Sequence, residues 1–156
     1  MRPPDTRIAR MRQEHLEEVL RLHVQVLGPI SARRLLARLR GRRRPLLLVA
    51  LHRERVVGYK FGFEDRPGRF YSWIGGVHPD FRRQGIGRAL MRCQHRLLAA
   101  AGYRSVRTHT RSKHRAMLLL NIATGFDVIG TFTDRRGQPK IILEKRLRRT
   151  SSPGAK

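Results

Sequence analysis

Residues 82–88 read Arg82-Arg83-Gln84-Gly85-Ile86-Gly87-Arg88, a stretch that follows an apolar, strand-like segment and opens an amphipathic helix. Its two glycines remove Cβ atoms at the point where a bulky anion must approach the backbone. The first N–H groups of a helix have no partner within the helix, and the helix dipole adds positive potential at the same end. The three arginines add guanidinium groups, which suit phosphate oxygens. The stretch therefore predicts a phosphate-binding junction between a strand and a helix.

The composition is that of a globular protein. With 156 residues, 40% of them hydrophobic, we expect one domain over residues 1–147 and a flexible basic tail at 148–156. The longest apolar run, residues 46–51, is far shorter than the ~20 residues that a membrane helix needs. No secretory segment is evident at the N-terminus, so a cytoplasmic location is expected. The single cysteine, Cys93, excludes an internal disulfide and a cysteine-built metal site, and its helical spacing predicts a small buried residue; no metal is expected.

The formal charge is +24, and 30 of the 35 cationic residues are arginine. A field of this size attracts nucleic acid through phosphate contacts. The alternative is that arginine is the general surface cation of this basic protein. The aromatic residues are few and are not interleaved with the arginines as a base-stacking surface requires. We favour the alternative, with at most nonspecific nucleic-acid binding, although one modest cluster is present at Arg38, Arg40, Arg42, Arg43 and Arg44.

Hydrophobic periodicity predicts the order β, α, α, β, β, β, α, β, α, β, β. This is a mixed α/β (α+β) class, with three antiparallel strands before the glycine stretch. A Rossmann fold would place three glycines in an early βαβ unit, and a Walker loop would need Gly-Lys-Ser or Gly-Lys-Thr. Both are disfavoured. The strands are expected at 6–11, 46–51, 55–64, 70–77, 104–110, 126–133 and 140–147, and the helices at 13–27, from a Ser31 cap through Leu39, at 85–101 and at 112–124.

Two signatures resemble one known family. Arg82, Gly85 and Gly87 match the acyl-CoA motif of the Gcn5-related N-acetyltransferase (GNAT) superfamily, and residues 76–82 are similar to its approach strand and turn. Residues 117–126 are similar to the family's helix that ends in Gly-Phe. The resemblance, which points to an uncharacterised bacterial branch, implies a mixed, mostly antiparallel sheet of six to seven strands flanked by about four helices on both faces.

The resemblance also implies a reaction, in which acetyl-CoA, as co-substrate, donates its acetyl group directly to a primary amine of a small molecule or protein. The coenzyme pyrophosphate would sit on the N–H groups of the glycine stretch, and the pantetheine would lie along residues 70–77. A backbone N–H near the end of that strand would polarise the thioester carbonyl. The expected cofactor contacts are Gly76, Val77, Arg82, Arg83, Gln84, Gly85, Ile86, Gly87, Arg88, His114 and Asn121.

The catalytic residues are less clearly marked. Glu64 is the first candidate for the general base, acting directly or through water, and an exposed turn carboxylate is the competing interpretation. At the position where the family carries a tyrosine that acts as the general acid, this chain has Asn121. The Asn121 amide would hydrogen-bond the coenzyme A sulfur or the acceptor, and Tyr71 is a possible substitute for the acid. The competing base candidates, equally open to a role in the turns alone, are Asp65, His78 and Asp80.

Two other function classes stay open. The missing tyrosine favours a non-catalytic acyl-CoA or anion-binding module, and the charge alone favours a nucleic-acid-binding protein. His23 lies on the apolar stripe of the first helix, beside Leu16, Val19, Leu20 and Leu27, and is expected to be a packed histidine. A homodimer is expected only from the resemblance. The sequence does not identify the acceptor.

Overall fold

The computed structural model describes residues 3–28 and 32–148. The order of its elements is the predicted order, with two short 3-10 helices in addition. The elements are β1 (Thr6–Arg10), η1 (Gln13–His15), α1 (Leu16–Leu27), α2 (Ala32–Leu39), β2 (Arg43–His52), β3 (Arg55–Arg66), β4 (Arg69–Val77), η2 (Pro79–Phe81), α3 (Ile86–Ala100), β5 (Ser105–Thr110), α4 (Arg115–Ala123), β6 (Asp127–Thr133) and β7 (Pro139–Arg146).

The strands form a seven-stranded sheet in the order β1-β2-β3-β4-β5-β7-β6. β4 and β5 pair in parallel, whereas the pairs β1–β2, β2–β3, β5–β7 and β6–β7 are antiparallel. The predicted mixed, mostly antiparallel sheet with four α-helices is therefore confirmed.

The chain forms two compact units, each described here by itself. The first comprises Met1–Glu64 and Trp73–Gln94, and the second comprises Asp65–Ser72 and His95–Lys156. β3, β4 and α3 contribute residues to both units. The expected single domain over residues 1–147 stays a prediction, and residues 149–156 of the expected tail lie outside the described part of the chain.

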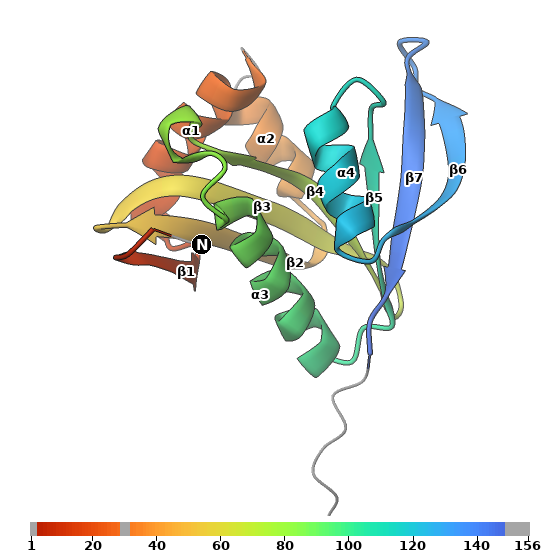
Figure 1. Cartoon of the computed structure of the whole chain (residues 1–156), viewed down its shortest axis with the longest axis horizontal. Helices are drawn as coiled ribbons and strands as arrows, with labels where there is room; N and C mark the ends of the chain where they lie inside the picture. Colours follow the sequence, from red (N-terminus) through yellow and green to blue (C-terminus); the bar gives the residue numbers. More distant parts are fainter. Residues whose placement is uncertain (1–2, 29–31, 149–156) are drawn as a thin grey trace, which may run out of the picture. The chain divides into compact units, whose positions relative to one another are not determined.

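The first unit is organised around β3. Tyr59 and Phe61 point to one face of this strand, where they pack in a buried cluster with Val19 and Leu22 of α1 and with Leu35 of α2. In Figure 1, α1 and α2 lie on one side of β2 and β3, and α3 lies on the other. Strand alternation thus separates a helical core on one face of β3 from the face that receives α3.

The buried stripe of α1 differs in part from the prediction. Val19 and His23 are buried as expected, but Leu22 is also buried and Leu27 is exposed. Burial is decided by the facing strands rather than by spacing alone. The interpretation of His23 as a packed histidine is confirmed, and its Nδ1 lies 2.7 Å from the Tyr59 hydroxyl oxygen.

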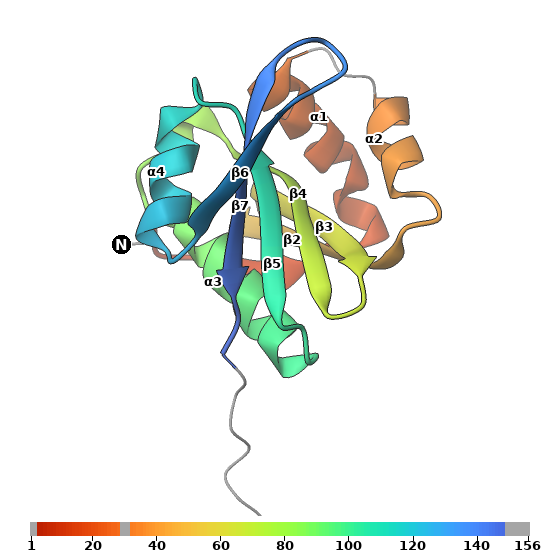
Figure 2. The same ribbon diagram turned by 90° about the vertical axis from the view of Figure 1, so that its right-hand side faces the viewer.

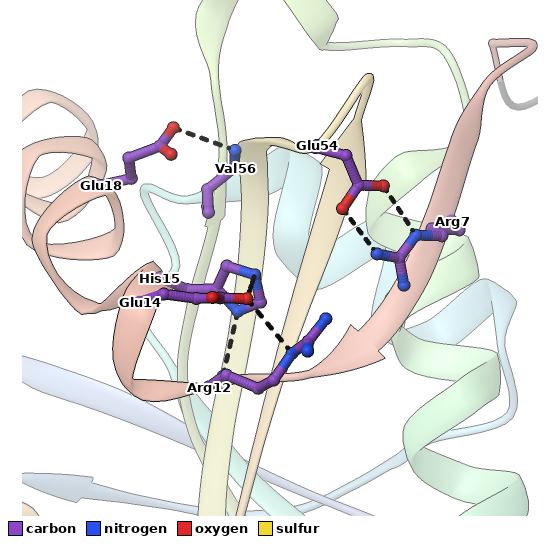
Figure 3. Close-up of polar contacts among 7 residues, drawn as sticks. All are labelled: Arg7, Arg12, Glu14, His15, Glu18, Glu54 and Val56. Carbon is purple, nitrogen blue, oxygen red and sulfur yellow. Dashed lines mark hydrogen bonds and ion pairs between the residues drawn. The ribbon is translucent and has the colours of Figure 1, made fainter.

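Polar contacts hold the β2–β3 hairpin against β1 and α1 (Figure 3). The Arg7 guanidinium donates to both carboxylate oxygens of Glu54, at 3.1 and 2.8 Å. The Glu18 carboxylate accepts the backbone N–H of Val56 at 3.2 Å. The Arg7–Glu54 pair is exposed, and water and salt screen such pairs strongly. Its role is to orient the turn rather than to stabilise the unit strongly.

In the second unit, β5, β7 and β6 lie side by side and α4 lies beside them (Figure 2). Val106 of β5 and Leu143 of β7 are fully buried at the centre of these strands. The Phe70 and Tyr103 rings pack edge to face, with centroids 5.7 Å apart. This unit therefore has an apolar core of its own.

Several predicted boundaries were wrong. The helix expected from residue 112 begins at Arg115, because His114 has ψ 62° and is not helical. β2 already begins at Arg43, within the expected basic loop, and β3 continues through Arg66, because strand pairing extends these elements beyond their apolar runs. The Ser31 cap lies outside the described residues.

The buried face of α3 is broader than the predicted stripe. Ile86 and Leu90 are buried as expected, and Gln94 is also fully buried. Cys93, expected to be buried, is only half-buried, because the buried face is rotated toward Gln94. Among the residues described, no helix is long and apolar enough to span a membrane.

The His23–Tyr59 contact predicts a pH-dependent stability. Burial lowers the pKa of His23 below its ordinary value of 6.5, so the unfolded chain binds a proton more readily than the native protein. The free energy of unfolding should therefore be highest above about pH 6.5 and fall as the pH decreases below it.

Urea unfolding between pH 5 and pH 8 measures this effect. His23→Gln should reduce the slope of the free energy of unfolding against pH. His114→Gln, which changes an exposed histidine, should leave that slope unchanged. An unchanged slope in His23→Gln would contradict the assignment.

Candidate functional site

The predicted junction lies at the N-terminus of α3. The chain leaves η2, passes through Arg82–Gly85, and enters α3 at Ile86. Gly85 has φ 80° and Arg83 has φ 61°, so the backbone turns twice through the left-handed region that glycine adopts most readily. The N–H of Ala89 donates to the Gly85 carbonyl at 2.9 Å and closes the first helical turn. The N–H groups before Ala89 are the ones that a helix leaves without internal partners.

Side chains fix the shape of this loop without filling it. The Arg82 Nε donates to the Val77 carbonyl at 3.2 Å, and the Gln84 amide donates to the Asp80 carbonyl at 3.2 Å. Arg83 and Arg88 are exposed. The loop thus presents two unburied guanidinium groups and the first N–H groups of a helix in one place, which is the arrangement that anions favour.

His78 takes part in the turn rather than facing a ligand. Its Nδ1 accepts the backbone N–H of Asp80 at 3.1 Å, and its own backbone N–H donates to the Val57 carbonyl at 2.8 Å. These contacts explain the position of His78 before Pro79 fully. They favour the interpretation as a turn residue over a role as base.

The end of β4 approaches its neighbours too closely for side chains. A Cβ atom on Gly75 would lie 2.9 Å from the Tyr59 carbonyl oxygen, and one on Gly76 would lie 2.8 Å from the Val26 Cγ1. Both distances are shorter than a Cβ tolerates. The two glycines are therefore required by packing, because neighbouring atoms of β3 and α1 occupy the space that a side chain would need.

Glu64 is a buried carboxylate, so its interpretation as an exposed turn residue was wrong. It lies within β3, and its side chain is only 7% exposed. Arg43 and Arg44 lie 3.7 and 3.9 Å from Oε2, too far for hydrogen bonds. Within the described part of the chain, Oε2 has no hydrogen-bond partner. A buried carboxylate oxygen with free acceptor capacity is suited to take a proton or to hold a water.

Lys60 is a residue that the sequence analysis missed. It lies on β3 opposite Leu48, and a Cβ on Gly75 would lie 3.7 Å from its Cβ, so Lys60 lies beside Gly75 of β4. Burial lowers the pKa of Lys60 from 10.5 to about 8. The signal was present in the sequence, because Lys60 is the one cation within the apolar segment 56–63.

The second unit holds the remaining predicted residues. The Tyr71 hydroxyl lies 3.3 Å from the His109 Nδ1. Burial, followed by the charges of Lys140 and Arg107, lowers the pKa of His109. Asn121 is the buried residue of α4, and its carbonyl accepts the N–H of Phe126 at 3.0 Å. These contacts couple β4 to β5 and fix the end of α4.

His114 is exposed at the N-terminus of α4, and its side chain does not cap the helix. Asp65 is engaged by Arg69, which donates to it through two nitrogens, at 2.8 Å in the shorter contact. The first unit thus contains the loop, the end of β4, Glu64 and Lys60, whereas Tyr71, Asn121 and His114 belong to the second. No group of three or more His, Cys, Asp or Glu side chains within residues 3–28 and 32–148 could hold a metal ion.

Comparison with known proteins gives one family. A family model described as an acetyltransferase (GNAT) domain matches residues 43–121, just over half of the chain. This match includes β2, β3, β4, the loop and α3. A search of the curated proteins finds no match to the chain.

Solved structures with this fold are numerous. The ribosomal-protein-S18-alanine N-acetyltransferase from Escherichia coli superposes with a TM-score of 0.80 at 18% identity, covering 96% of this chain and 97% of that one. Ard1 from Thermoplasma volcanium superposes with a TM-score of 0.80 at 19% identity, covering 92% of this chain and 99% of that one. A phosphinothricin acetyltransferase from Sinorhizobium meliloti, solved with AcCoA, superposes with a TM-score of 0.75 at 20% identity. The superposition covers 92% of this chain and 89% of that one. At these identities the similarity is one of fold.

The half-buried ammonium of Lys60 predicts a stabilising substitution. Lys60→Met should raise the free energy of unfolding at pH 7 by about 1 kcal/mol, because methionine fills a similar volume without a desolvated charge. The native pKa of about 8 lies below the unfolded value of 10.5, so the penalty is complete below pH 8 and disappears as the pH rises to 10.5.

Denaturant unfolding at pH 7 and pH 9.5 tests this expectation. The gain of Lys60→Met should shrink at the higher pH. Lys113→Met, which changes an exposed lysine, serves as the matched control and should change stability by less than about 0.5 kcal/mol. A loss of stability in Lys60→Met at pH 7 would contradict the burial penalty.

Proposed function

Because the chain belongs to the GNAT acetyltransferase family, as the match over residues 43–121 shows, we propose that it transfers an acetyl group from acetyl-CoA directly to a primary amine of a small molecule or protein. The observation that carries the proposal is the geometry at the N-terminus of α3. There, left-handed backbone at Arg83 and Gly85 and exposed arginines give an arrangement that suits an anion, and it lies within the matched residues.

The donor is proposed to bind along the first unit. The pyrophosphate of acetyl-CoA would accept hydrogen bonds from the N–H groups of residues 83–88, with the dipole of α3 and the guanidinium groups of Arg83 and Arg88 supplying positive charge. The pantetheine would lie along the end of β4, beside Gly75 and Gly76. This places both ends of the donor on elements that pack on β3.

The chemical step is a direct transfer. The acceptor nitrogen attacks the thioester carbonyl carbon, and the C–N bond forms as the carbonyl oxygen becomes an oxyanion. A backbone N–H at Gly76 or Val77 would stabilise that oxyanion. The C–S bond then breaks, CoA leaves as a thiolate, and the amine gives up one proton. Much of the acceleration would come from holding the two reactants together.

Glu64 is proposed to accept the amine proton, directly or through a water. Its burial and the free Oε2 support this role. An alkylamine has a reference pKa of about 10.4, so a base is needed at neutral pH. Tyr71 is the proposed proton donor to the departing sulfur, and its contact with His109 would hold the hydroxyl in place. Asn121 would hydrogen-bond the sulfur or the acceptor, and His114 would contact the cofactor.

The acceptor remains a class rather than a molecule. The charge of +24 disfavours polycationic amines, because their approach would be repelled. A cytoplasmic site of action is part of the proposal. A non-catalytic acyl-CoA-binding module is the second candidate. It is favoured by the amide of Asn121, which stands where the family carries a tyrosine that acts as the general acid.

The proposal predicts that the loop is required for donor binding. Gly85→Glu places a Cβ at φ 80° and adds a negative charge where the pyrophosphate would sit. It should abolish the rise in melting temperature caused by acetyl-CoA and lower release of CoA thiol over a panel of amines by at least about 100-fold.

Gly137→Glu is the matched control. Gly137 has φ 76° and lies in the turn between β6 and β7, so the same substitution adds the same charge and a similar backbone strain. This variant should keep both the thermal shift and the turnover. A thermal shift without turnover in the unaltered protein would favour the binding module, and no shift would contradict the proposed site.

The assignment of Glu64 predicts a selective loss of turnover. Glu64→Gln keeps the shape of the side chain but removes the proton acceptor, so kcat should fall by about 100-fold at neutral pH while the acetyl-CoA thermal shift persists. Raising the pH should recover part of the rate, because more of the amine is then unprotonated. Glu54→Gln, in the exposed β2–β3 turn, should retain full activity. Equal rates for Glu64→Gln and the unaltered protein would exclude Glu64 as base.

A further inference from the structure

The start of β2 contains an irregularity that places two consecutive arginines beside one carboxylate. Arg43 pairs with Glu64 of β3. The next pair along β2 joins Leu46 to Gly62, so β2 has one residue more than β3 between the two pairs. Arg44 lies in this bulge with φ 44°, a backbone conformation that residues other than glycine seldom adopt.

The bulge changes where the two side chains lie. Successive side chains of a regular strand point to opposite faces of the sheet. Here the guanidinium groups of Arg43 and Arg44 both lie near the same atom, 3.7 and 3.9 Å from Glu64 Oε2. A bulge that redirects a side chain is a frequent feature next to an active site.

Arg42, one residue earlier, is explained by packing. Its guanidinium lies 4.6 Å from the centre of the Phe63 ring. Phe63 precedes Glu64 on β3, so its side chain points to the other face of the strand. The Arg43 and Arg44 side chains are instead 73% and 71% exposed. Cover of this ring accounts for Arg42, and it leaves the next two guanidinium groups open to a molecule from solvent.

The carboxylate that faces these arginines is an independent sign of a ligand. The Glu64 side chain is only 7% exposed, and among the described residues its Oε2 has no hydrogen-bond partner. A buried polar atom is normally hydrogen-bonded, so an atom that is not requires an explanation. An ionised carboxylate only accepts hydrogen bonds. The group that completes Oε2 must therefore be a donor, such as a water or an amine.

Charge narrows the kind of molecule that fits. Two guanidinium groups and one carboxylate together carry one net positive charge, and a protonated amine at Glu64 alone would increase it. A molecule that carries both an amine and an anionic group supplies a donor for Oε2 and acceptors for the arginines at the same time. Guanidinium groups bind carboxylate and phosphate oxygens through charge-assisted hydrogen bonds.

We propose that the acceptor is an amine that also carries a carboxylate or phosphate group close to its amino group. Arg43 and Arg44 bind this anion, and the amine then reaches Glu64. The two arginines are positioning residues, because they orient the acceptor and take no proton from it. The inference rests on the proposed acetyl transfer with Glu64 as its base. The charge of +24 attracts the same anionic molecules from solution.

Matched pairs of amines that differ in one anionic group test the proposal. β-Alanine is compared with β-alaninamide, and ethanolamine phosphate with ethanolamine, by release of CoA thiol from acetyl-CoA. The anionic member of at least one pair should have a kcat/KM at least about 10-fold higher. The pair with the larger preference identifies the anion as carboxylate or phosphate. Raising NaCl from about 0.1 to 0.5 M should reduce the preference, because salt screens exposed charges.

Substitution of the two arginines should remove the preference. Arg43→Gln combined with Arg44→Gln should raise the KM of the anionic amine at least about 10-fold. The kcat/KM of the neutral amine should change by less than about 2-fold. Arg43→Lys combined with Arg44→Lys keeps the charge without the planar fork, so it should retain part of the preference.

Arg53→Gln combined with Arg55→Gln is the matched control. It removes two exposed arginines near the beginning of β3, and each of them is ion-paired with a carboxylate. This variant should keep the full preference. Glu64→Gln should slow both members of a pair by the same factor, because the base acts on every amine.

The possible failures are distinguishable. Equal use of both members of each pair, or an unchanged preference in the Arg43 and Arg44 double-glutamine variant, would overturn the anionic acceptor and leave the acetyl transfer standing. Loss of turnover with neutral amines in that variant, with a normal acetyl-CoA thermal shift, would overturn the positioning role. Absence of CoA thiol release with every amine would overturn both proposals.

Discussion

The contact between α3 and Gly58 is the constraint on which the candidate site depends. A Cβ on Gly58 would lie 3.2 Å from both the Ile86 Cγ2 and the Leu90 Cδ1. The helix therefore packs directly onto the backbone of β3, and the position of its first turn follows from that contact. On the opposite face of the same strand, Tyr59 packs in the core with α1. A helix N-terminus can serve as an anion site only where its free N–H groups are held toward one place, and β3 provides that support from both faces.

The same strand carries the two groups whose environment is least ordinary. Glu64 keeps a buried oxygen without a hydrogen bond, and Lys60 keeps an ammonium that burial disfavours. Hydrophobic side chains at these positions would satisfy the packing at lower cost. Glu64 forms ion pairs with Arg43 and Arg44, at 3.7 and 3.9 Å from Oε2. Buried ionisable groups are concentrated at functional sites. The proposed donor path along β4 passes beside β3, so these groups support the placement of the chemistry in the first unit.

The sequence predicted the element order, the loop at residues 82–88 and the buried histidine, because each depends on local pattern. Periodicity shows where a helix lies, and glycines with arginines show where a backbone turns toward an anion. It did not predict which residues each partner strand would bury. Leu22 replaced Leu27 on the buried face of α1, and Gln94 joined that of α3, because burial depends on the strands opposite. Glu64 was the first candidate for the general base, with an exposed turn carboxylate as the competing interpretation. Its burial was not predicted, because strand pairing continues β3 through Arg66 and nothing local signals that extension.

Arginine is both the main surface cation of this chain and a structural side chain. The Arg42 guanidinium lies 4.6 Å from the Phe63 ring centre, and that of Arg38 lies 5.6 Å from Trp73. These contacts cover aromatic rings with a cation that also keeps copies of the chain apart. Two of the five arginines that form the basic cluster in the sequence thus have a packing role, which weakens the charge-based case for nucleic-acid binding. Among the described residues, most of the exposed large apolar side chains lie on α4 and β6, where the sequence from 116 to 134 has no arginine. The distribution of arginine therefore follows the distribution of covered aromatic surface in this chain.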